Sequence, residues 1–240
     1  MQIYLVLFFQ ATAYLALIPM ILYGDWYQYI ISFTMYFLYN GIGMIMTYHR
    51  LLSHRVFECP KWLEYIMASL ATFSITGSAI TWVAMHRKHH RYTDTEKDPH
   101  SPDYLGWWRV QFLTAFAPIE GKYAVELMRD KFYKFQHKYY LHILSAFSLL
   151  LVLIDPFMLI YIFLFPAGLT LFFGTLILST CHKDCKPRNI FWLGIVTFGD
   201  AFHEVHHNDA RIPRLHKYDI VGWIIEKIFY DKTTILGKSH

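Results

Sequence analysis

Long apolar stretches without Lys, Arg, Asp or Glu alternate with basic stretches along the chain. The apolar stretches form two pairs, each pair joined by a short turn at Gly24 and Asp25 or at Asp155 and Pro156. Their ranges are 3–23 and 26–46, then 140–154 and 157–181. About 20 apolar helical residues cross a bilayer core, although 140–154 is short for this. The pattern predicts two transmembrane hairpins.

Basic residues indicate how these hairpins are oriented. All 22 Lys and Arg fall into three blocks, 50–138, 183–188 and 211–238. Because cytoplasmic segments of membrane proteins are enriched in Lys and Arg, we expect these blocks and both termini to lie on the cytoplasmic side.

The segments between the hairpins are expected to form a helical cap. Residues 62–85 are apolar but rich in Ser, Thr and Gly, so we predict that they lie along or dip into the interface. Residues 97–138 are polar, aromatic and basic and are predicted to rest on lipid headgroups. An amphipathic stretch, 220–229, is predicted to pack on the cap or on the membrane surface.

Composition supports one all-α integral membrane domain covering residues 1–240. Hydrophobic residues make up 55% of the chain and aromatic residues 19%, which is too apolar for an ordinary soluble protein. With a net charge of only +4, the expected partner is a lipid bilayer and not a nucleic acid. Three cysteines beside basic segments make disulfides unexpected.

Histidines cluster in four segments that this topology places on one side of the membrane. The segments HRLLSH (49–54), HRKHH (86–90) and HEVHH (203–207) each hold two or three, and His182 follows the fourth apolar stretch. In a helix, His86, His89 and His90 project from one face. His49 and His54 are five apart, so they share a site only if the helix ends or bends between them, for which Ser53 and Pro60 are candidates.

Nine imidazoles are too many for one tetrahedral zinc and suit two metal ions with nitrogen-rich coordination. The predicted ligands are His49, His54, His86, His89, His90, His182, His203, His206 and His207. The alternative for the second segment is a solvated basic surface, because Arg87, Lys88 and Arg91 interleave its histidines. A zinc half-site at Cys181, His182 and Cys185 would lack a second cysteine pair. His100, His137, His142, His216 and His240 are interpreted as non-ligands.

These motifs resemble the three histidine boxes of the membrane fatty-acid desaturases, and the WVAMHRKHHRYTDTEKDPH context resembles the acyl-CoA, stearoyl-type Δ9 branch. The resemblance implies insertion of a cis double bond into a saturated acyl chain, with O₂, two electrons and two iron ions. It assigns iron to the nine histidines above. Leu178 stands where the family has an asparagine that contacts one iron through water, and Glu204 where the acyl-CoA branch commonly has asparagine.

Two further sets of residues are candidates for supporting roles. Asp94 and Asp98 resemble the family's carboxylates that orient ligating imidazoles, with capping of a helix end as the alternative. Phe37, Gly41 and Ile45 share an α-helical stripe leading to His49. We predict that Phe37 and Gly41 line an acyl tunnel and that Phe37 closes it, with ordinary helix packing as the alternative.

The sequence holds no flavin or dinucleotide fingerprint and no cytochrome b5 His-Pro-Gly-Gly motif, so a separate ferredoxin or cytochrome b5 type donor is expected. The substrate is expected to be a fatty acyl-CoA or an acyl-lipid. A related alkane, fatty-acid or carotenoid hydroxylase is the main alternative. An HExxH zinc protease with Glu204 as base would leave five histidines unused, and a metal transporter would place ionisable ligands within the bilayer.

Overall fold

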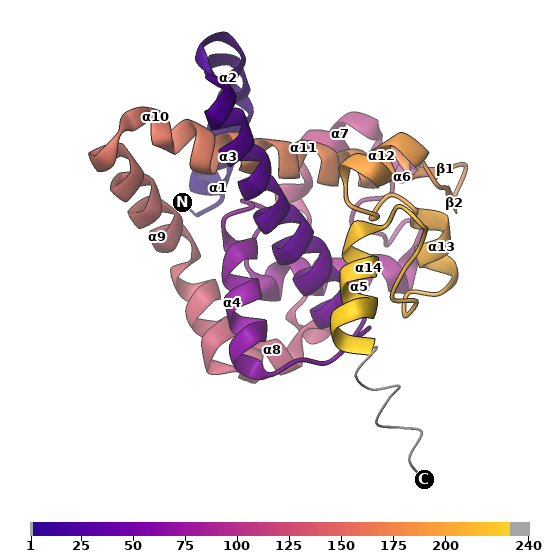
Figure 1. Ribbon diagram of the computed structural model, residues 1–240. Helices are drawn as coiled ribbons and strands as arrows, with labels where there is room; N and C mark the ends of the chain where they lie inside the picture. The colour runs from indigo at the N-terminus through magenta and orange to yellow at the C-terminus, as the bar shows by residue number, and fades with distance from the viewer. Residues whose placement is uncertain (1, 231–240) are drawn as a thin grey trace.

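The computed structural model describes residues 2–230, which form a helical structure with one short two-stranded sheet (Figure 1). Its first half contains α1 Gln2–Leu15, α2 Leu17–Tyr23, α3 Trp26–Tyr36, η1 Phe37–Ser53, α4 Lys61–Thr72, α5 Ala79–Tyr92, α6 Pro102–Leu105, α7 Trp107–Phe112, η2 Thr114–Phe116, η3 Gly121–Tyr123 and α8 Val125–Arg129. Its second half contains α9 Lys131–Ile154, α10 Pro156–Met158, η4 Leu159–Leu164, α11 Phe165–Thr180, β1 His182–Lys183, β2 Lys186–Pro187, α12 Phe191–Val196, α13 His203–Asn208, α14 Ile220–Ile225 and η5 Glu226–Tyr230.

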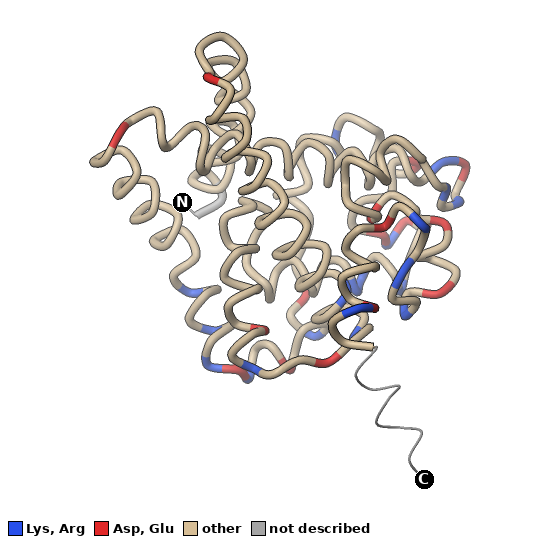
Figure 2. Tube along the Cα trace, in the orientation of Figure 1, with Lys and Arg blue, Asp and Glu red and all other residues tan. Residues whose placement is uncertain are grey.

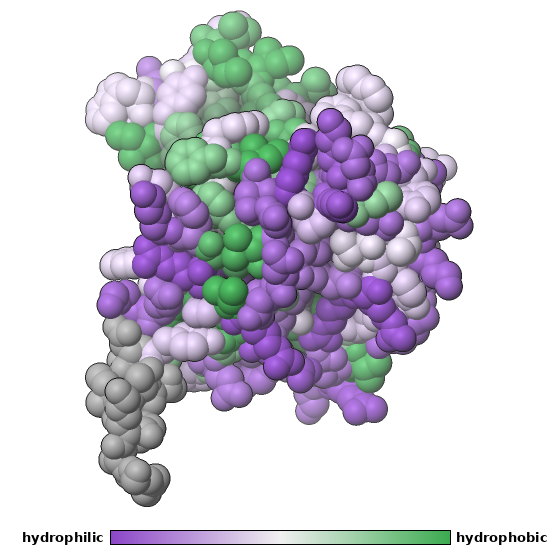
Figure 3. Space-filling view, turned by 90° about the vertical axis from the view of Figure 1, so that its right-hand side faces the viewer, coloured by the Kyte–Doolittle hydropathy of each residue, from purple (hydrophilic) through white to green (hydrophobic). Residues whose placement is uncertain are grey.

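Four helical stretches are long and apolar enough to cross a membrane, as the hydrophobic pattern predicts. They are Tyr4–Tyr23, Trp26–Ser53, Lys131–Ile154 and Pro156–Thr180. Charged positions gather at the lower and right-hand parts of the molecule, and the upper turns carry only isolated acidic positions (Figure 2). The surface view likewise shows hydrophobic residues gathered at the top and hydrophilic residues below (Figure 3). This division is the one expected of a membrane protein with a polar cap.

The predicted start of the third span at Tyr140 is wrong. Helix α9 begins at Lys131 and runs unbroken for 24 residues. Lys131, Lys134 and Lys138 are all exposed, so the helix extends past the apolar stretch with its basic side chains in solvent. The apolar stretch 140–154, which is short for a bilayer crossing, is therefore the apolar end of a helix that is long enough to span the membrane.

Residues 62–85 form two helices, α4 and α5, and neither is among the four membrane-length helices of the described chain. Between them the backbone turns through two left-handed positions, Ile75 (φ 60°) and Gly77 (φ 111°). Ser78 then begins α5, because its hydroxyl accepts a hydrogen bond from the Thr81 N–H. This break directs α5, with its histidines, back along the polar half of the molecule.

The second membrane-length helix changes its winding before it reaches the histidines. From Phe37 to Ser53 it is a π-helix, in which backbone bonds run from residue i+5 to residue i, so residues five apart share a face. Gly43 lets this helix approach α4 closely, since a Cβ there would lie 2.5 Å from the Ala71 backbone nitrogen. The π-helix that carries the first histidine segment is thus packed closely against α4.

Candidate metal centre

The nine histidines predicted from the sequence come together in two groups. His49, His54, His86, His90 and His206 form the first, here called the five-histidine group. His89, His182, His203 and His207 form the second, here called the four-histidine group. In each group the candidate ligand atoms lie within 4.8 Å of one another. No cysteine belongs to a candidate metal group of the described residues, which disfavours the half-site at Cys181 and Cys185.

The π-helix explains how His49 and His54 share a group. The predicted helix end between them is confirmed at Ser53, because the helix ends there and His54 is its C-terminal cap. The His54 N–H donates to the His49 carbonyl at 3.2 Å, an i+5 to i bond. The wider winding places residues five apart on one face.

Facing helices contribute to both groups. On α5, His86 and His90 belong to the five-histidine group and His89 to the other. On α13, His206 belongs to the five-histidine group, whereas His203 and His207 belong to the other. The start of α13 is held by Asn189, whose side-chain oxygen accepts the Glu204 N–H at 3.0 Å.

Ring nitrogens approach each other closely within both groups. In the five-histidine group, Nε2 of His206 lies 2.9 Å from Nε2 of both His49 and His90. In the four-histidine group, Nε2 of His203 lies 3.0 Å from that of His182 and 3.1 Å from that of His207. Neighbouring ligands about 2.1 Å from one octahedral ion are about 3.0 Å apart, whereas tetrahedral ligands are about 3.4 Å apart. The two groups therefore fit two ions of high coordination number, with imidazole nitrogens and no thiolates as ligands.

Burial favours the neutral form of five of these imidazoles, which is the form that binds metal. Removal from water, reinforced by neighbouring histidines, lowers the pKa of His86, His89, His203 and His206 well below the usual value. The pKa of His90 falls to about 3 for the same reasons. The lone pairs of these five side chains are thus available at neutral pH.

Carboxylates contact the ring nitrogens that face away from the groups. Asp98 lies 2.9 Å from His89 Nδ1, and Asp94 lies 3.0 Å from His182 Nδ1. Asp98 also accepts the backbone N–H groups of Asp94 and His100, so it organises a loop and caps no helix. Burial raises the pKa of Asp98 to about 6.

The sequence analysis missed a third carboxylate, Asp200, which lies 2.7 Å from His49 Nδ1. Burial alone would raise its pKa, but His49 and Arg50 nearby hold the pKa of Asp200 below its usual range. The only signal in the sequence is an acidic residue three positions before His203, at the end of an apolar stretch.

One histidine interpreted as a non-ligand, His100, lies near the site. It is buried and, with His89 and Asp98, forms a third candidate group, but His89 Nδ1 already faces Asp98 and His89 Nε2 faces His207. We therefore interpret His100 as a neighbour of the site. His137, His142 and His216 belong to neither group, and His240 lies outside the described residues.

Glu204 does not have the position that a zinc protease requires. It is exposed, and its carboxylate accepts the Asn189 side-chain amide at 3.0 Å. The histidines on either side of it are divided between two groups that also use other segments. This arrangement disfavours the HExxH interpretation.

A cavity of about 710 Å³, here called the central cavity, lies beside both groups. His49 and His86 of one group and His203 of the other line it, together with Asp200 and Leu178. Its remaining lining comes from α1, η1, α5, α9 and α11 and is mostly apolar. Such a volume is typical of a site for a small, apolar ligand.

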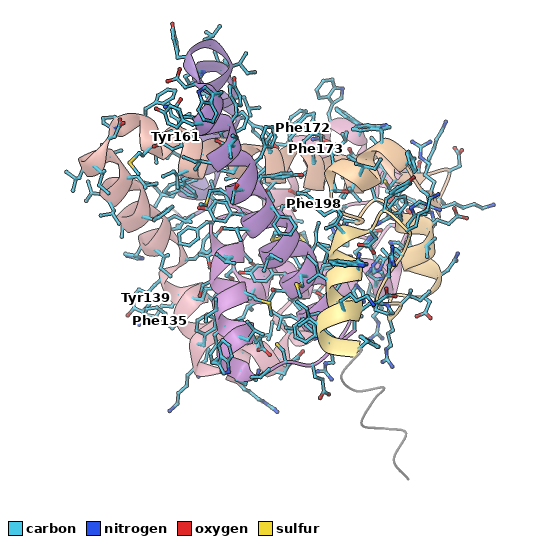
Figure 4. The ribbon with its side chains drawn as sticks, in the orientation of Figure 1. Phe135, Tyr139, Tyr161, Phe172, Phe173 and Phe198 are labelled. Carbon is cyan, nitrogen blue, oxygen red and sulfur yellow. The ribbon has the colours of Figure 1, made fainter. Side chains whose placement is uncertain are left out.

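Phe37 and Gly41 are not among the residues that line the central cavity, whereas Ile45 and His49 of the same predicted stripe are. Asn40 and Met44, which lie beside that stripe on the π-helix, also line the cavity. Phe37 packs edge-to-face on Phe198, which is labelled in Figure 4, with ring centroids 5.1 Å apart. The alternative interpretation, helix packing, describes their contacts.

Comparison with known proteins gives one consistent result. The family model described as fatty acid desaturase matches residues 24–233. The chain is 35% identical to the "Delta-9 acyl-lipid desaturase 2" of Arabidopsis thaliana, over 86% of this chain and 73% of the relative. It is 32% identical to the "sn-2 palmitoyl-lipid 9-desaturase" of Nostoc sp. (80% and 72%), and 29% identical to the "Acyl-CoA C20 Delta5-desaturase" of Anemone leveillei (86% and 70%).

Proposed function

The chain belongs to the fatty acid desaturase family, in its delta-9 branch, and on this premise we propose that it inserts a cis double bond into a saturated acyl chain at a di-iron centre. The reaction consumes O₂ and two electrons. It removes one hydrogen from each of two neighbouring carbons, the ninth and tenth if this chain acts as its relatives' names indicate.

The observation that carries the proposal is the pair of all-nitrogen histidine groups at the wall of one apolar cavity. Nine imidazoles with ring nitrogens 2.7–3.2 Å apart fit two iron ions. The five-histidine and four-histidine groups would each hold one. The bound iron ions would supply the redox chemistry with O₂.

The residues of this chain position the reaction. Asp200, Asp98 and Asp94 would each hold an Nδ1–H of a ligating imidazole, which fixes its tautomer and direction. The apolar wall of the central cavity would exclude water and hold the acyl chain so that one carbon pair meets the metals. Leu178 adds an apolar side chain to this wall.

The proposed setting is a membrane with both hairpins embedded and with the histidines and both termini on the cytoplasmic side. The separation of charged from apolar surface supports it. The substrate is a fatty acyl-CoA or an acyl-lipid, and a separate ferredoxin or cytochrome b5 type protein supplies the electrons.

Product analysis tests the proposal. The chain is expressed in a desaturase-deficient host, and total fatty acids are analysed by gas chromatography with mass spectrometry. A double variant, His89→Ala with His90→Ala, is the control because it removes a histidine from each group. New monounsaturated chains that vanish in the control are expected. Hydroxylated chains, or a purified protein that binds zinc and no iron, would overturn it.

A further inference from the structure

The central cavity opens between two of the membrane-length helices. Many of its lining residues are buried or half-buried, but Leu5 on α1, Ile119, and His137, Lys138, His142 and Ser145 on α9 both line it and are exposed. Helix α9 packs on α4, α5 and α8 and runs along the left-hand edge of the molecule (Figure 1). The opening therefore faces sideways, in the direction a bilayer would occupy.

Side chains on α9 mark the depth of this opening. Phe135 and Tyr139 lie on the outer side of α9, with rings 4.9 Å apart (Figure 4). Aromatic side chains of membrane helices concentrate at headgroup level. Lys131 and Lys134 lie on one side of this pair, and the exposed apolar residues Leu149, Leu150 and Val152 to Ile154 lie on the other. Lys138 and His142 are thus at the boundary between headgroups and hydrocarbon.

Lys138 is available to bind an anion. Among residues 2–230, no ion pair includes its ammonium group, which lies over the Tyr139 ring at 5.0 Å. His137, also on the rim, contacts the Ser78 hydroxyl at 2.8 Å through Nδ1. The rim is therefore polar and cationic, whereas the cavity behind it is apolar.

A second cavity, of about 380 Å³, shares Thr114 and Ala117 with the central cavity and is the competing entrance. It is lined by four basic side chains, but two of these, Lys88 and Lys122, are paired with Glu120. Glu96 and Asp98 add further negative charge. This balance disfavours the several phosphates of coenzyme A, so the opening between α1 and α9 is the better entrance.

Resting on the proposed function, we propose that the substrate is a diacyl phospholipid that enters sideways between α1 and α9. Lys138 binds the lipid phosphodiester, with His142 beside it on the rim. One acyl chain extends through the central cavity to the histidine groups, while the headgroup stays at the membrane surface. The residues of this rim select an acyl chain that is still esterified in the bilayer.

Photo-crosslinking tests this entrance without requiring turnover. The purified full chain is placed in nanodiscs that contain phosphatidylglycerol with a diazirine in one acyl chain, and adducts on Met44 and Met85 of the cavity wall are quantified by mass spectrometry. Ser145→Trp, which obstructs the opening, should abolish these adducts. Lys138→Gln should lower them about fivefold. Lys134→Gln and Leu149→Trp, on the same helix outside both cavities, should leave them unchanged.

Competition distinguishes the sources of the acyl chain. Unlabelled phosphatidylglycerol should displace the probe better than a diacyl galactolipid, which lacks the phosphate, and better than an acyl-CoA. The proposal is overturned if a diazirine acyl-CoA labels the cavity of Ser145→Trp as strongly as that of the wild type, or if Lys138→Gln labels like Lys134→Gln. Lipid labelling of a protein that desaturates nothing in the expression host would refute the proposed function but not this entrance. Desaturation without lipid labelling would refute this entrance but not the proposed function.

Discussion

Asp200 offers the sharpest test of the proposed metal centre. Asp200→Asn keeps the shape of the side chain and an acceptor oxygen but removes the negative charge 2.7 Å from His49 Nδ1. Outer carboxylates raise the basicity of a ligating imidazole, and their loss typically costs 10–100-fold in metal affinity. This is about 1.4–2.7 kcal/mol. Because His49 belongs to the five-histidine group, only the ion held there should bind more weakly.

The measurement is anaerobic titration of metal-stripped protein with Fe(II) against a competing chelator, which gives two dissociation constants. Asp94→Asn should weaken the other site, since Asp94 contacts His182 of the four-histidine group. Glu204→Gln is the matched control, because Glu204 lies in the third histidine segment but contacts Asn189 at the surface. If Asp200→Asn binds both ions as tightly as Glu204→Gln, the role assigned to this carboxylate is refuted.

Three further predictions concern stability. Because burial holds the pKa of His90 at about 3, the folded metal-free protein binds fewer protons than the unfolded chain below about pH 6.5. Its free energy of unfolding should therefore be highest above that pH and should fall as the pH drops, by up to about 1.4 kcal/mol per pH unit for each such histidine. A thermal midpoint unchanged from pH 8 to pH 5 would contradict this. Arg50→Met should cost about 3–5 kcal/mol, because it leaves Asp219, 2.8 Å away, charged and buried. Thermal unfolding measures this loss, and adding Asp219→Leu should restore most of it. Gly43→Val should cost at least about 1–3 kcal/mol by overpacking against α4, whereas Gly174→Val, with open space around its Cβ, should cost less in the same assay.

The membrane-length helices and the nine clustered histidines could be predicted from the sequence because both depend on local patterns. An apolar run of about 20 residues has few stable alternatives to a membrane helix. Histidines at i, i+3 and i+4 share a helical face whatever the rest of the fold. Both arguments need only the residues within one segment.

The sequence was less informative where the winding of a helix, or a contact between distant segments, decides which side chains meet. Phe37, Gly41 and Ile45 were placed on one stripe with α-helical geometry, but the segment is a π-helix, and the residues of this stretch that line the cavity are Asn40, Met44 and Ile45. Nothing in the local sequence pattern specifies that winding. Asp200 pairs with a histidine 151 positions earlier, and such a contact exists only in the folded chain.

The spacing of the second and third histidine segments acquires a meaning only when the two groups are seen together. On α5, the pair four apart, His86 and His90, serves the five-histidine group, and the histidine between them serves the other. On α13 the allocation is reversed, since His203 and His207 serve the four-histidine group. Each helix therefore gives an i, i+4 pair to one site and its i+3 residue to the other.

This exchange couples the two sites mechanically. A rotation of either helix about its axis would move ligands of both groups, so neither ion could be held correctly while the other is misplaced. Contacts that fix the start of each helix, such as the Ser78 hydroxyl on α5 and the Asn189 amide on α13, therefore support both sites together. Reactions that draw on two metals at once require their relative position to be fixed, and the interleaved spacing provides this from short helices.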